Sequence, residues 1–131
     1  MLDNVIDINY YSVPQAKNSN LKHRPIGMGI MGFQDALYMQ RIPYSSEQAV
    51  EFADISMEMI SYHAIQASSD LAEERGRYES YEGSLWDQGK FPIDSLKLLQ
   101  QERGAEYLDV NLDQRLDCES FRLRIHQTGM R

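Results

Sequence analysis

Side chains that could attack a substrate or bind a metal ion are few in this sequence and lie far apart. They are Cys118, His23, His63 and His126. A cysteine thiol becomes reactive beside a cation or at a helix start, but His126 lies two turns beyond Cys118, so we interpret this cysteine as structural. The histidines lack the His-x-x-x-His or Cys-x-x-Cys spacing of a zinc site. We therefore predict no metal site, and we expect His63 to make one hydrogen bond on a helix.

Acidic and phenolic side chains show no catalytic pattern either. Glu73 and Glu74 precede Arg75 near a helix end and fit a solvated face, because general acid–base work needs two acids that the fold brings together. Four tyrosines could transfer a radical but are more typical of packing: Tyr10, Tyr11, Tyr78 and Tyr81. The residues themselves thus predict no catalytic and no cofactor-binding position.

The glycine-rich stretch Gly27-x-Gly29-x-x-Gly32 superficially matches the dinucleotide-binding fingerprint. That fingerprint follows a buried strand, opens a helix, and is followed by an acidic residue about 20 positions on. Here the preceding residues, Lys17 to Arg24, are polar, and the nearest acids, Glu47 and Glu51, fall inside a predicted long helix. A nucleotide-binding module, which would bind NAD or FAD, is therefore not favoured.

Composition and charge are those of one soluble domain. The 131 residues carry a net charge of −7, which disfavours binding to nucleic acid. The two basic clusters, Lys17 to Arg24 and the group Arg122, Arg124 and His126, fit ordinary solvated faces. No apolar run is long enough to span a membrane, the first residues lack a signal-peptide pattern, and the single cysteine fits a reducing compartment. We expect a cytoplasmic protein with no membrane and no nucleic-acid partner.

The apolar spacing predicts a mainly helical chain. Helices are expected over residues 2–11, 33–39 and 46–75, then from a cap at Asp94-Ser95 to Gly104, and from a cap at Asp117 to Gly129. The longest should begin at Ser45 or Ser46, where Ser45-x-x-Gln48 fits a capping box. It should end at Gly76, in the left-handed conformation that glycine favours.

The remaining segments give only one plausible strand, at residues 26–31, with a weak second at Tyr107 to Val110. Pro14 should break the first helix, Gln15 to His23 should be a surface connection, and residues 77–93 should form a loop. A lone strand has no partner for its backbone groups. The chain is therefore either a helical bundle with an irregular glycine-rich turn, or it lacks the rest of its sheet.

An ordered series of segments resembles one known family, the large (alpha) subunit of class I ribonucleoside-diphosphate reductase. The series comprises Asp3 to Tyr11, Asn18 to Phe33 with its His23-Arg24-Pro25-Ile26-Gly27-Met28-Gly29 core, Gln34 to Tyr38, Gly83-Ser84, Gly89-Lys90-x-Pro92-Ile93-Asp94 and Gly129-Met130-Arg131. The resemblance covers essentially the whole chain and rests on many matches in order.

The resemblance implies an α/β fold in which residues 1–131 are a single partial domain. They would form a helix-rich, internal fragment of a ten-stranded α/β barrel that is incomplete on its own. Residues 26–31 would be one barrel strand, and the glycines would let that strand and the following helix pack closely. Arg131 would fall just before a strand and a Pro-Thr loop that help hold the substrate phosphates in the family.

The resemblance also implies a function that this fragment supports without performing its chemistry. The family reduces ribonucleoside diphosphates to deoxyribonucleoside diphosphates through a thiyl radical, with ATP and dNTP effectors and a radical from a small (beta) subunit. The family's catalytic residues map to no position here, and Cys118 stands where the family usually has tryptophan. The expected partners are the remainder of the large subunit and the small subunit. The fragment alone would be inactive scaffold that binds no cofactor.

A second hypothesis of a different class remains open from the residues alone. The helix over residues 46–75 carries two apolar rows, one of which includes Ala49, Ala53 and Met57 and the other Phe52 and Ile55. A small helical interaction module could use such a helix as a partner groove or as a dimer seam.

Overall fold

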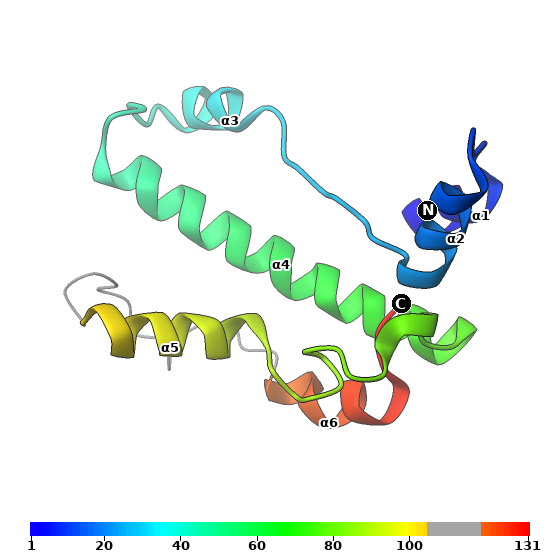
Figure 1. Cartoon of the computed structure of the whole chain (residues 1–131). Coiled ribbons are helices and arrows are strands. Elements are labelled where there is room, and N and C mark those ends of the chain that lie inside the picture. Colours follow the sequence, from blue (N-terminus) through cyan, green and yellow to red (C-terminus); the bar gives the residue numbers. More distant parts are fainter. Residues whose placement is uncertain (105–118) are drawn as a thin grey trace.

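One long helix, α4 (Glu47–Arg75), forms the axis of the structure, a computed structural model that describes residues 1–104 and 119–131 (Figure 1). The helix begins after Ser46, whose Oγ accepts a hydrogen bond from the backbone N–H of Ala49 (3.3 Å). It ends at Gly76, whose N–H donates to the carbonyl of Ala72 (2.9 Å). The predicted helix is confirmed, and of the two predicted caps the structure uses Ser46, so the capping box predicted for Ser45 and Gln48 is wrong. Gly76 has the expected positive φ (84°), but its ψ of 160° lies outside the left-handed helical region.

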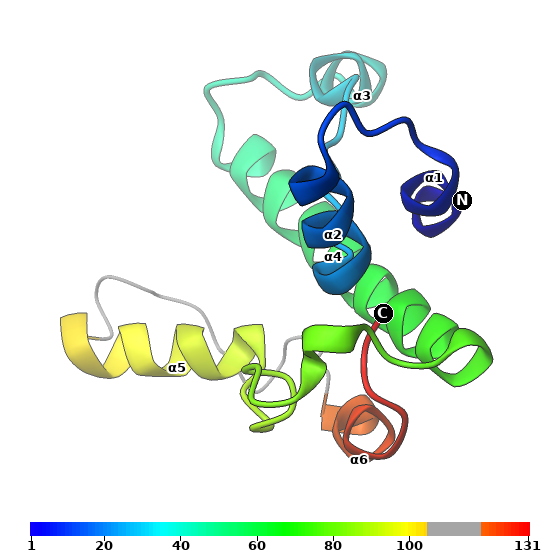
Figure 2. The ribbon, with the colours of Figure 1, turned by 45° about the vertical axis from the view of Figure 1, so that its right-hand side comes forward.

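Two short helices, α1 (Leu2–Ile8) and α2 (Pro14–His23), lie near the C-terminal end of α4 (Figures 1 and 2). The first ends three residues earlier than predicted, because Asn9 is extended (φ −70°, ψ 149°). The predicted surface connection at Gln15 to His23 is wrong. Pro14 occupies the first turn of α2, where its missing N–H leaves no hydrogen bond unmade. The proline therefore starts a helix instead of interrupting one.

An extended segment, residues 25–32, leads from α2 to α3 (Phe33–Gln40) at the far end of α4 (Figure 1). Among the described residues there is no strand, so the predicted strand at 26–31 is wrong for this structure. A strand needs a ladder partner, and the described part of the chain supplies none. The predicted close packing at the glycines is also absent, since a Cβ at Gly27 or Gly29 would meet nothing within 4 Å.

Helix α3 confirms the helix predicted at residues 33–39 to within one residue. It starts after Gly32, which has a positive φ of 79°. It is held on α4 by Phe33, whose ring stacks on that of Phe52 with centroids 5.7 Å apart. Leu37 is fully buried.

The C-terminal half contains the 3-10 turn η1 (Glu79–Tyr81) and helices α5 (Pro92–Arg103) and α6 (Glu119–Thr128). The loop predicted at 77–93 is confirmed apart from η1 and the first turn of α5. Helix α5 begins at Pro92, two residues before the cap predicted at Asp94. Asp94 lies inside the first turn instead, where its carboxylate accepts a hydrogen bond from the N–H of Phe91 (2.8 Å). The predicted ends of α5 and α6 at Gly104 and Gly129 are confirmed. Asp117, Cys118 and residues 107–110 lie outside the described residues.

The buried core is small and sits where the η1 loop, α5 and α6 meet. Its members are Tyr81, Phe91, Ile93, Ile125 and Met130, with Ile65, Tyr78 and Trp86 packed against it. The Tyr81 hydroxyl donates to the carbonyl of Ile125 (3.1 Å), and Trp86 meets Phe91 edge to face with centroids 5.4 Å apart. The described residues thus form a helix-rich unit, without the ten-stranded barrel that the resemblance implies. None of the described helices combines the length and hydropathy needed to cross a bilayer.

Large apolar side chains remain outside this core along the N-terminal half of α4 and the segments beside it. Met31 is 96% exposed, Met39 86% and Val50 69%. We predict that the isolated chain associates through these surfaces, because contiguous exposed apolar area drives association. Light scattering after gel filtration should show species larger than a monomer. A sharp cooperative melt and a dispersed NMR spectrum from a monomer would contradict this prediction.

Candidate functional site

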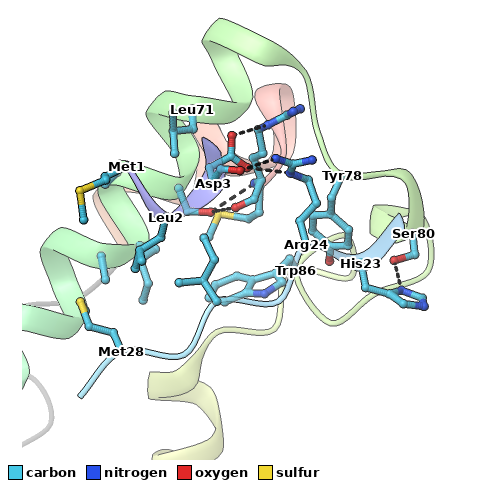
Figure 3. Close-up of a pocket in the computed structure, with 17 residues that line it drawn as sticks. Met1, Leu2, Asp3, His23, Arg24, Met28, Leu71, Tyr78, Ser80 and Trp86 are labelled. Atoms are coloured by element: carbon cyan, nitrogen blue, oxygen red, sulfur yellow. Dashed lines mark hydrogen bonds and ion pairs between the residues drawn. The ribbon is translucent and has the colours of Figure 1, made fainter. Parts of the chain in front are cut away.

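Three arginines surround one buried carboxylate in the Asp3 cluster, which we define as Asp3 with Arg24, Arg75 and Arg131. Asp3 is buried, with 2% of its surface exposed. It lies in the first turn of α1, where a negative charge is favoured by the helix dipole. Each arginine comes from a different part of the chain, so this carboxylate joins positions 3, 24, 75 and 131. Asp3 and Arg24 of this cluster are labelled in Figure 3.

Arg24 binds one side of the carboxylate. It caps α2 in the left-handed conformation (φ 47°, ψ 48°), with its N–H bonded to the carbonyl of Asn20 (2.8 Å). Its Nε donates to Oδ1 of Asp3 (2.6 Å), and its Nη2 donates to the carbonyl of the same residue (2.8 Å). Two further bonds, of 2.9 and 3.1 Å, join Arg24 to the carboxylate of Asp7. This planar donor set uses the fork geometry that distinguishes arginine from lysine.

The other carboxylate oxygen faces two arginines. Oδ2 of Asp3 accepts from Nη1 of Arg75 (3.0 Å) and from Nε of Arg131 (3.1 Å). Arg131 also donates from Nη1 to the carbonyls of Arg75 and Gly76 (3.0 Å each), and so caps the end of α4. Arg75 has a second acidic partner in Glu74 (3.2 Å) and bonds Asn4. The cluster thus ties α1 to both α2 and the last turn of α4.

The backbone around Arg131 is held as firmly as its side chain. The hydroxyl of Ser68 donates to the carbonyl of Arg131 (2.6 Å) and accepts from its N–H (3.2 Å). The N–H of Tyr78 donates to the carbonyl of Met130 (3.0 Å). Residues 130 and 131 are therefore fixed between α4 and the η1 loop.

The cluster changes the acidity of its members. Burial alone would raise the pKa of Asp3, but the hydrogen bonds and charges of Arg24 and Arg131 outweigh it, so the pKa lies below its ordinary value. The pKa of Asp7 is also lowered, mainly by its hydrogen bond from Arg24. The pKa of Arg24 is raised, first by its bond to Asp7. The carboxylates stay ionised near neutral pH, so the cluster is a set of ion pairs without a proton donor or base.

A cavity of about 930 Å³ opens beside the cluster. Its lining is mostly apolar and comes from α1, α4, the extended segment, the η1 loop and the chain end (Figure 3). At its edge, Nδ1 of His23 lies 2.6 Å from Oγ of Ser80, which also contacts the carbonyl of Lys22 (3.3 Å). A serine–histidine pair needs a third group to orient the histidine, and in the described part of the chain no carboxylate is bonded to His23. This pair links α2 to η1 and is not a catalytic triad.

The histidines and acids singled out in the sequence differ in their surroundings. His63 makes one hydrogen bond, to Gln66 on the same helix (3.2 Å), as predicted. Glu73 and Glu74 are solvent-exposed, as predicted, and each pairs with an arginine. Within residues 1–104 and 119–131, three or more potential ligands nowhere gather to hold a metal ion. His126 is exposed, and Cys118 lies outside the described residues.

The four tyrosines differ in environment. Tyr10 is 86% exposed, whereas Tyr81 is buried. Tyr11 donates its hydroxyl to the carbonyl of Ile6 (2.7 Å), and Tyr78 meets Tyr81 edge to face with ring centroids 5.7 Å apart. The packing interpretation is confirmed for Tyr78 and Tyr81.

The basic clusters are only partly the solvated faces that the sequence suggested. Arg24 is buried in the Asp3 cluster, and Arg122 bonds Asp94 (3.1 and 3.2 Å) and lies over the ring of Phe91. The hydrogen bond from Arg122 lowers the pKa of Asp94. Arg124 pairs with Asp70 and Glu73.

Sequence reasoning missed the Asp3 cluster. The signal was the spacing of Asp3 and Asp7, which places two like charges on one face of a helix, where they repel unless a cation lies between them. The sequence does not say which of the 13 lysines and arginines supplies that cation.

Comparison with known proteins matches the whole chain. The family model described as "Ribonucleotide reductase, barrel domain" matches residues 1–131. The chain is 56% identical over 131 residues to ribonucleoside-diphosphate reductase subunit alpha of Chlamydia muridarum, covering 100% of this chain and 12% of that protein. It is 40% identical over 136 residues to the alpha subunit of Helicobacter pylori (100% of this chain, 16% of that protein). It is 43% identical over 93 residues to the large subunit of Caenorhabditis elegans (71% of this chain, 12% of that protein). The chain therefore spans only a small part of the length of these relatives.

Removing the charge of Asp3 should loosen the N-terminal helices. Asp3→Asn leaves three arginines around a neutral amide, and the loss of one partner of a buried ion pair costs about 3–5 kcal/mol. Urea unfolding of the 131-residue chain, followed by circular dichroism at 222 nm at one fixed chain concentration because the chain is expected to associate, should shift to lower urea. Asp7→Asn is the matched control on the same helix, and its 46% exposed carboxylate should give a smaller shift. Equal shifts for the two variants would contradict the central role of Asp3.

The same carboxylate predicts an acid-sensitive structure. Because the pKa of Asp3 is lowered on folding, its stabilisation is complete above the pKa of an unfolded aspartate, about 3.9, and is lost as the pH falls through the lower folded value. The urea concentration at the midpoint of unfolding should therefore fall as the pH is lowered from neutral to about 2. The fall should be shallower in Asp3→Asn, and parallel curves for the two proteins would disprove this assignment.

Proposed function

The chain belongs to the ribonucleotide reductase barrel-domain family, and we propose that it works as part of the large (alpha) subunit of a ribonucleoside-diphosphate reductase. In this role it contributes to the reduction of ribonucleoside diphosphates to deoxyribonucleoside diphosphates for DNA synthesis. The observation that carries the proposal is the match along all 131 residues to alpha subunits, at up to 56% identity among the relatives named above.

The contribution of this chain is scaffold. The side chains that gather in the described residues form ion pairs, aromatic contacts and an apolar cavity, and none of these groups supplies a nucleophile, a redox pair or a metal ligand set. We therefore propose that the 131-residue chain alone is inactive and that the catalytic residues lie elsewhere in the subunit. In this proposal, residues 1–131 are a partial domain.

We further propose that residues 26–31 are one strand of a ten-stranded α/β barrel whose other strands belong to the rest of the subunit. The alternation of side chains along this segment supports the proposal, because residues two apart share a face of a strand. Ile26 and Met28 line the cavity beside α4. Gly27 and Gly29, on the alternate positions, have open space around them. Glycine within a strand often marks the close approach of another backbone.

The partners and cofactors of this proposal belong to the whole enzyme. They are the remainder of the large subunit, a small (beta) subunit that provides a radical, ATP and dNTP effectors, and a thioredoxin-type reductant. None of the cofactors would bind to residues 1–131. The single cysteine is consistent with a cytoplasmic enzyme.

A chimera tests the proposed function. Residues 1–131 replace the matching segment of the Chlamydia muridarum alpha subunit, and reduction of ribonucleoside diphosphates is measured with the small subunit, effector and reductant. We expect the chimera to keep activity within about tenfold of the parent, and the 131-residue chain alone to have none. The parent carrying a scrambled segment is the control. A chimera that folds and assembles but lacks activity would refute the proposal and favour the helical interaction module.

The proposed strand predicts that one substitution destabilises the chimera but not the 131-residue chain. Gly29→Val adds a side chain where the 131-residue chain has open space, so its helix content and urea midpoint should not fall. In the chimera, strands from the rest of the subunit would crowd the same position, and overpacking costs about 1–3 kcal/mol. Thermal unfolding of the chimera should therefore begin several degrees lower. An unchanged chimera would argue against a strand at this position.

A further inference from the structure

Helices α1 and α2 form a small unit that is joined to α3 by a single exposed segment. Within this N-terminal unit, residues 1–24, the side chain of Arg24 bonds both Asp3 and Asp7 and so holds the two helices together. The unit lies beside the C-terminal end of α4 in both views of the ribbon (Figures 1 and 2). The buried core cluster contains no residue of the unit. The unit can therefore leave its place while the core stays intact.

Polar side chains connect the N-terminal unit to α4, η1 and the chain end. Each of these contacts joins one residue of the unit to one residue outside it. They are Asp3 with Arg75 and Arg131, Asn4 with Arg75, Lys22 with Glu79, and His23 with Ser80. The same set of contacts therefore forms equally well between two copies of the chain.

The extended segment that follows the unit, residues 25–32, has few interactions of its own. All of its residues are solvent-exposed, and a Cβ at Gly27 or Gly29 would meet nothing within 4 Å. In the described part of the chain, the backbone of residues 25–31 makes no hydrogen bond to another backbone group. Unpaired extended backbone is a template for pairing with a second chain. Two copies of the segment that are related by a two-fold axis run antiparallel, so each can supply the partners that the other lacks.

The segment begins next to a strained backbone position. Arg24 has φ 47° and ψ 48°, a left-handed conformation that is uncommon for residues other than glycine. Pro25 follows it, and a proline favours an extended conformation in the residue before it. Turning Arg24 to an extended conformation relieves this strain and redirects the segment away from its own α4. Strain in a connecting loop favours the exchange of elements between copies of a chain.

We propose that the 131-residue chain forms a domain-swapped dimer, in which the N-terminal unit of each copy occupies the place beside α4 and η1 of the other copy. Each Asp3 cluster then takes Asp3 and Arg24 from one copy and Arg75 and Arg131 from the other. The contacts of the monomer are kept, the two extended segments pair with each other, and Arg24 relaxes. These two gains offset the freedom that the copies lose on association. The dimer is distinct from association through the apolar surface of α4, and it does not depend on the proposed function.

Joint refolding of two single-cysteine chains tests the swap. One chain carries His23→Cys and the other carries Ser80→Cys, and both carry Cys118→Ser. The chains are mixed in concentrated urea, refolded together at high concentration and oxidised, and the disulfide-linked peptides are measured by mass spectrometry. Nδ1 of His23 lies 2.6 Å from Oγ of Ser80, so the swap brings these positions of two copies together. We expect 23–80 disulfides to exceed 23–23 and 80–80 disulfides at least about tenfold, because the swap raises the effective concentration of that pair.

A matched control separates the swap from unspecific association. In the control mixture Ser61→Cys replaces Ser80→Cys, since Ser61 is exposed on α4 and is not part of the contacts described above. A yield of 23–80 disulfide no greater than that of 23–61 disulfide would overturn the proposal. If circular dichroism shows that His23→Cys or Ser80→Cys disrupts folding, Lys22→Cys and Glu79→Cys report on the same contact between α2 and η1, with the same two outcomes.

A variant of the extended segment tests the strain. Pro25→Ala frees Arg24 from the restriction that a following proline imposes, so the closed monomer becomes more stable relative to the dimer. The yield of 23–80 disulfide at the same chain concentration should fall at least about threefold. Pro43→Ala, at an exposed proline between α3 and α4, is the control and should leave the yield unchanged. A yield that Pro25→Ala does not lower would contradict the part that the proposal gives to Arg24.

Discussion

The placement of α1 against α2 and the last turn of α4 depends on one buried carboxylate. Asp3 is almost fully removed from solvent, and a buried charge is tolerated only when it is paired and hydrogen-bonded. Its two oxygens face different elements, with Arg24 on Oδ1 and Arg75 and Arg131 on Oδ2. Helix α1 must therefore lie where α2, the last turn of α4 and the chain end meet. The buried core cluster does not fix α1 or α2 directly, because it contains no residue of either helix.

The apolar surface of the chain exceeds what its own elements cover. Helix α4 is 29 residues long, yet only Ala49, Ser69 and Ala72 of it are buried. The extended segment before α3 likewise exposes Ile26, Met28 and Ile30. In a complete domain, helices bury their apolar faces on a sheet or on other helices. Here the helices carry the apolar side chains for such packing, but the described residues contain no sheet. This imbalance agrees with a chain that covers only 12% of the length of its Chlamydia muridarum relative.

The sequence predicted the helices that carry strong local signals and failed where the outcome depended on distant residues. Ser46, Gly76, Gly104 and Gly129 end or begin helices as predicted, because capping is decided within one turn. Pro14 was misinterpreted, since a proline that stops one helix is equally suited to start another. The strand at residues 26–31 could not form, because pairing needs a partner that the described residues do not include. The Asp3 cluster was missed, because no periodicity relates positions 3, 24, 75 and 131.

The glycine-rich stretch shows why chemistry could not be inferred from a local pattern. The fingerprint Gly27-x-Gly29-x-x-Gly32 has meaning for a nucleotide only when a strand precedes it and a helix N-terminus receives the phosphates. The structure puts helix α2 before it, and five residues outside any helix separate Gly27 from the start of α3 at Phe33. Only Gly32 has a backbone conformation that favours glycine, with a φ of 79°. Gly27 and Gly29 are thus not required by their own surroundings in residues 1–104 and 119–131. Under the proposed function, a requirement for glycine at these positions would come from a neighbour in the rest of the large subunit that approaches the open face.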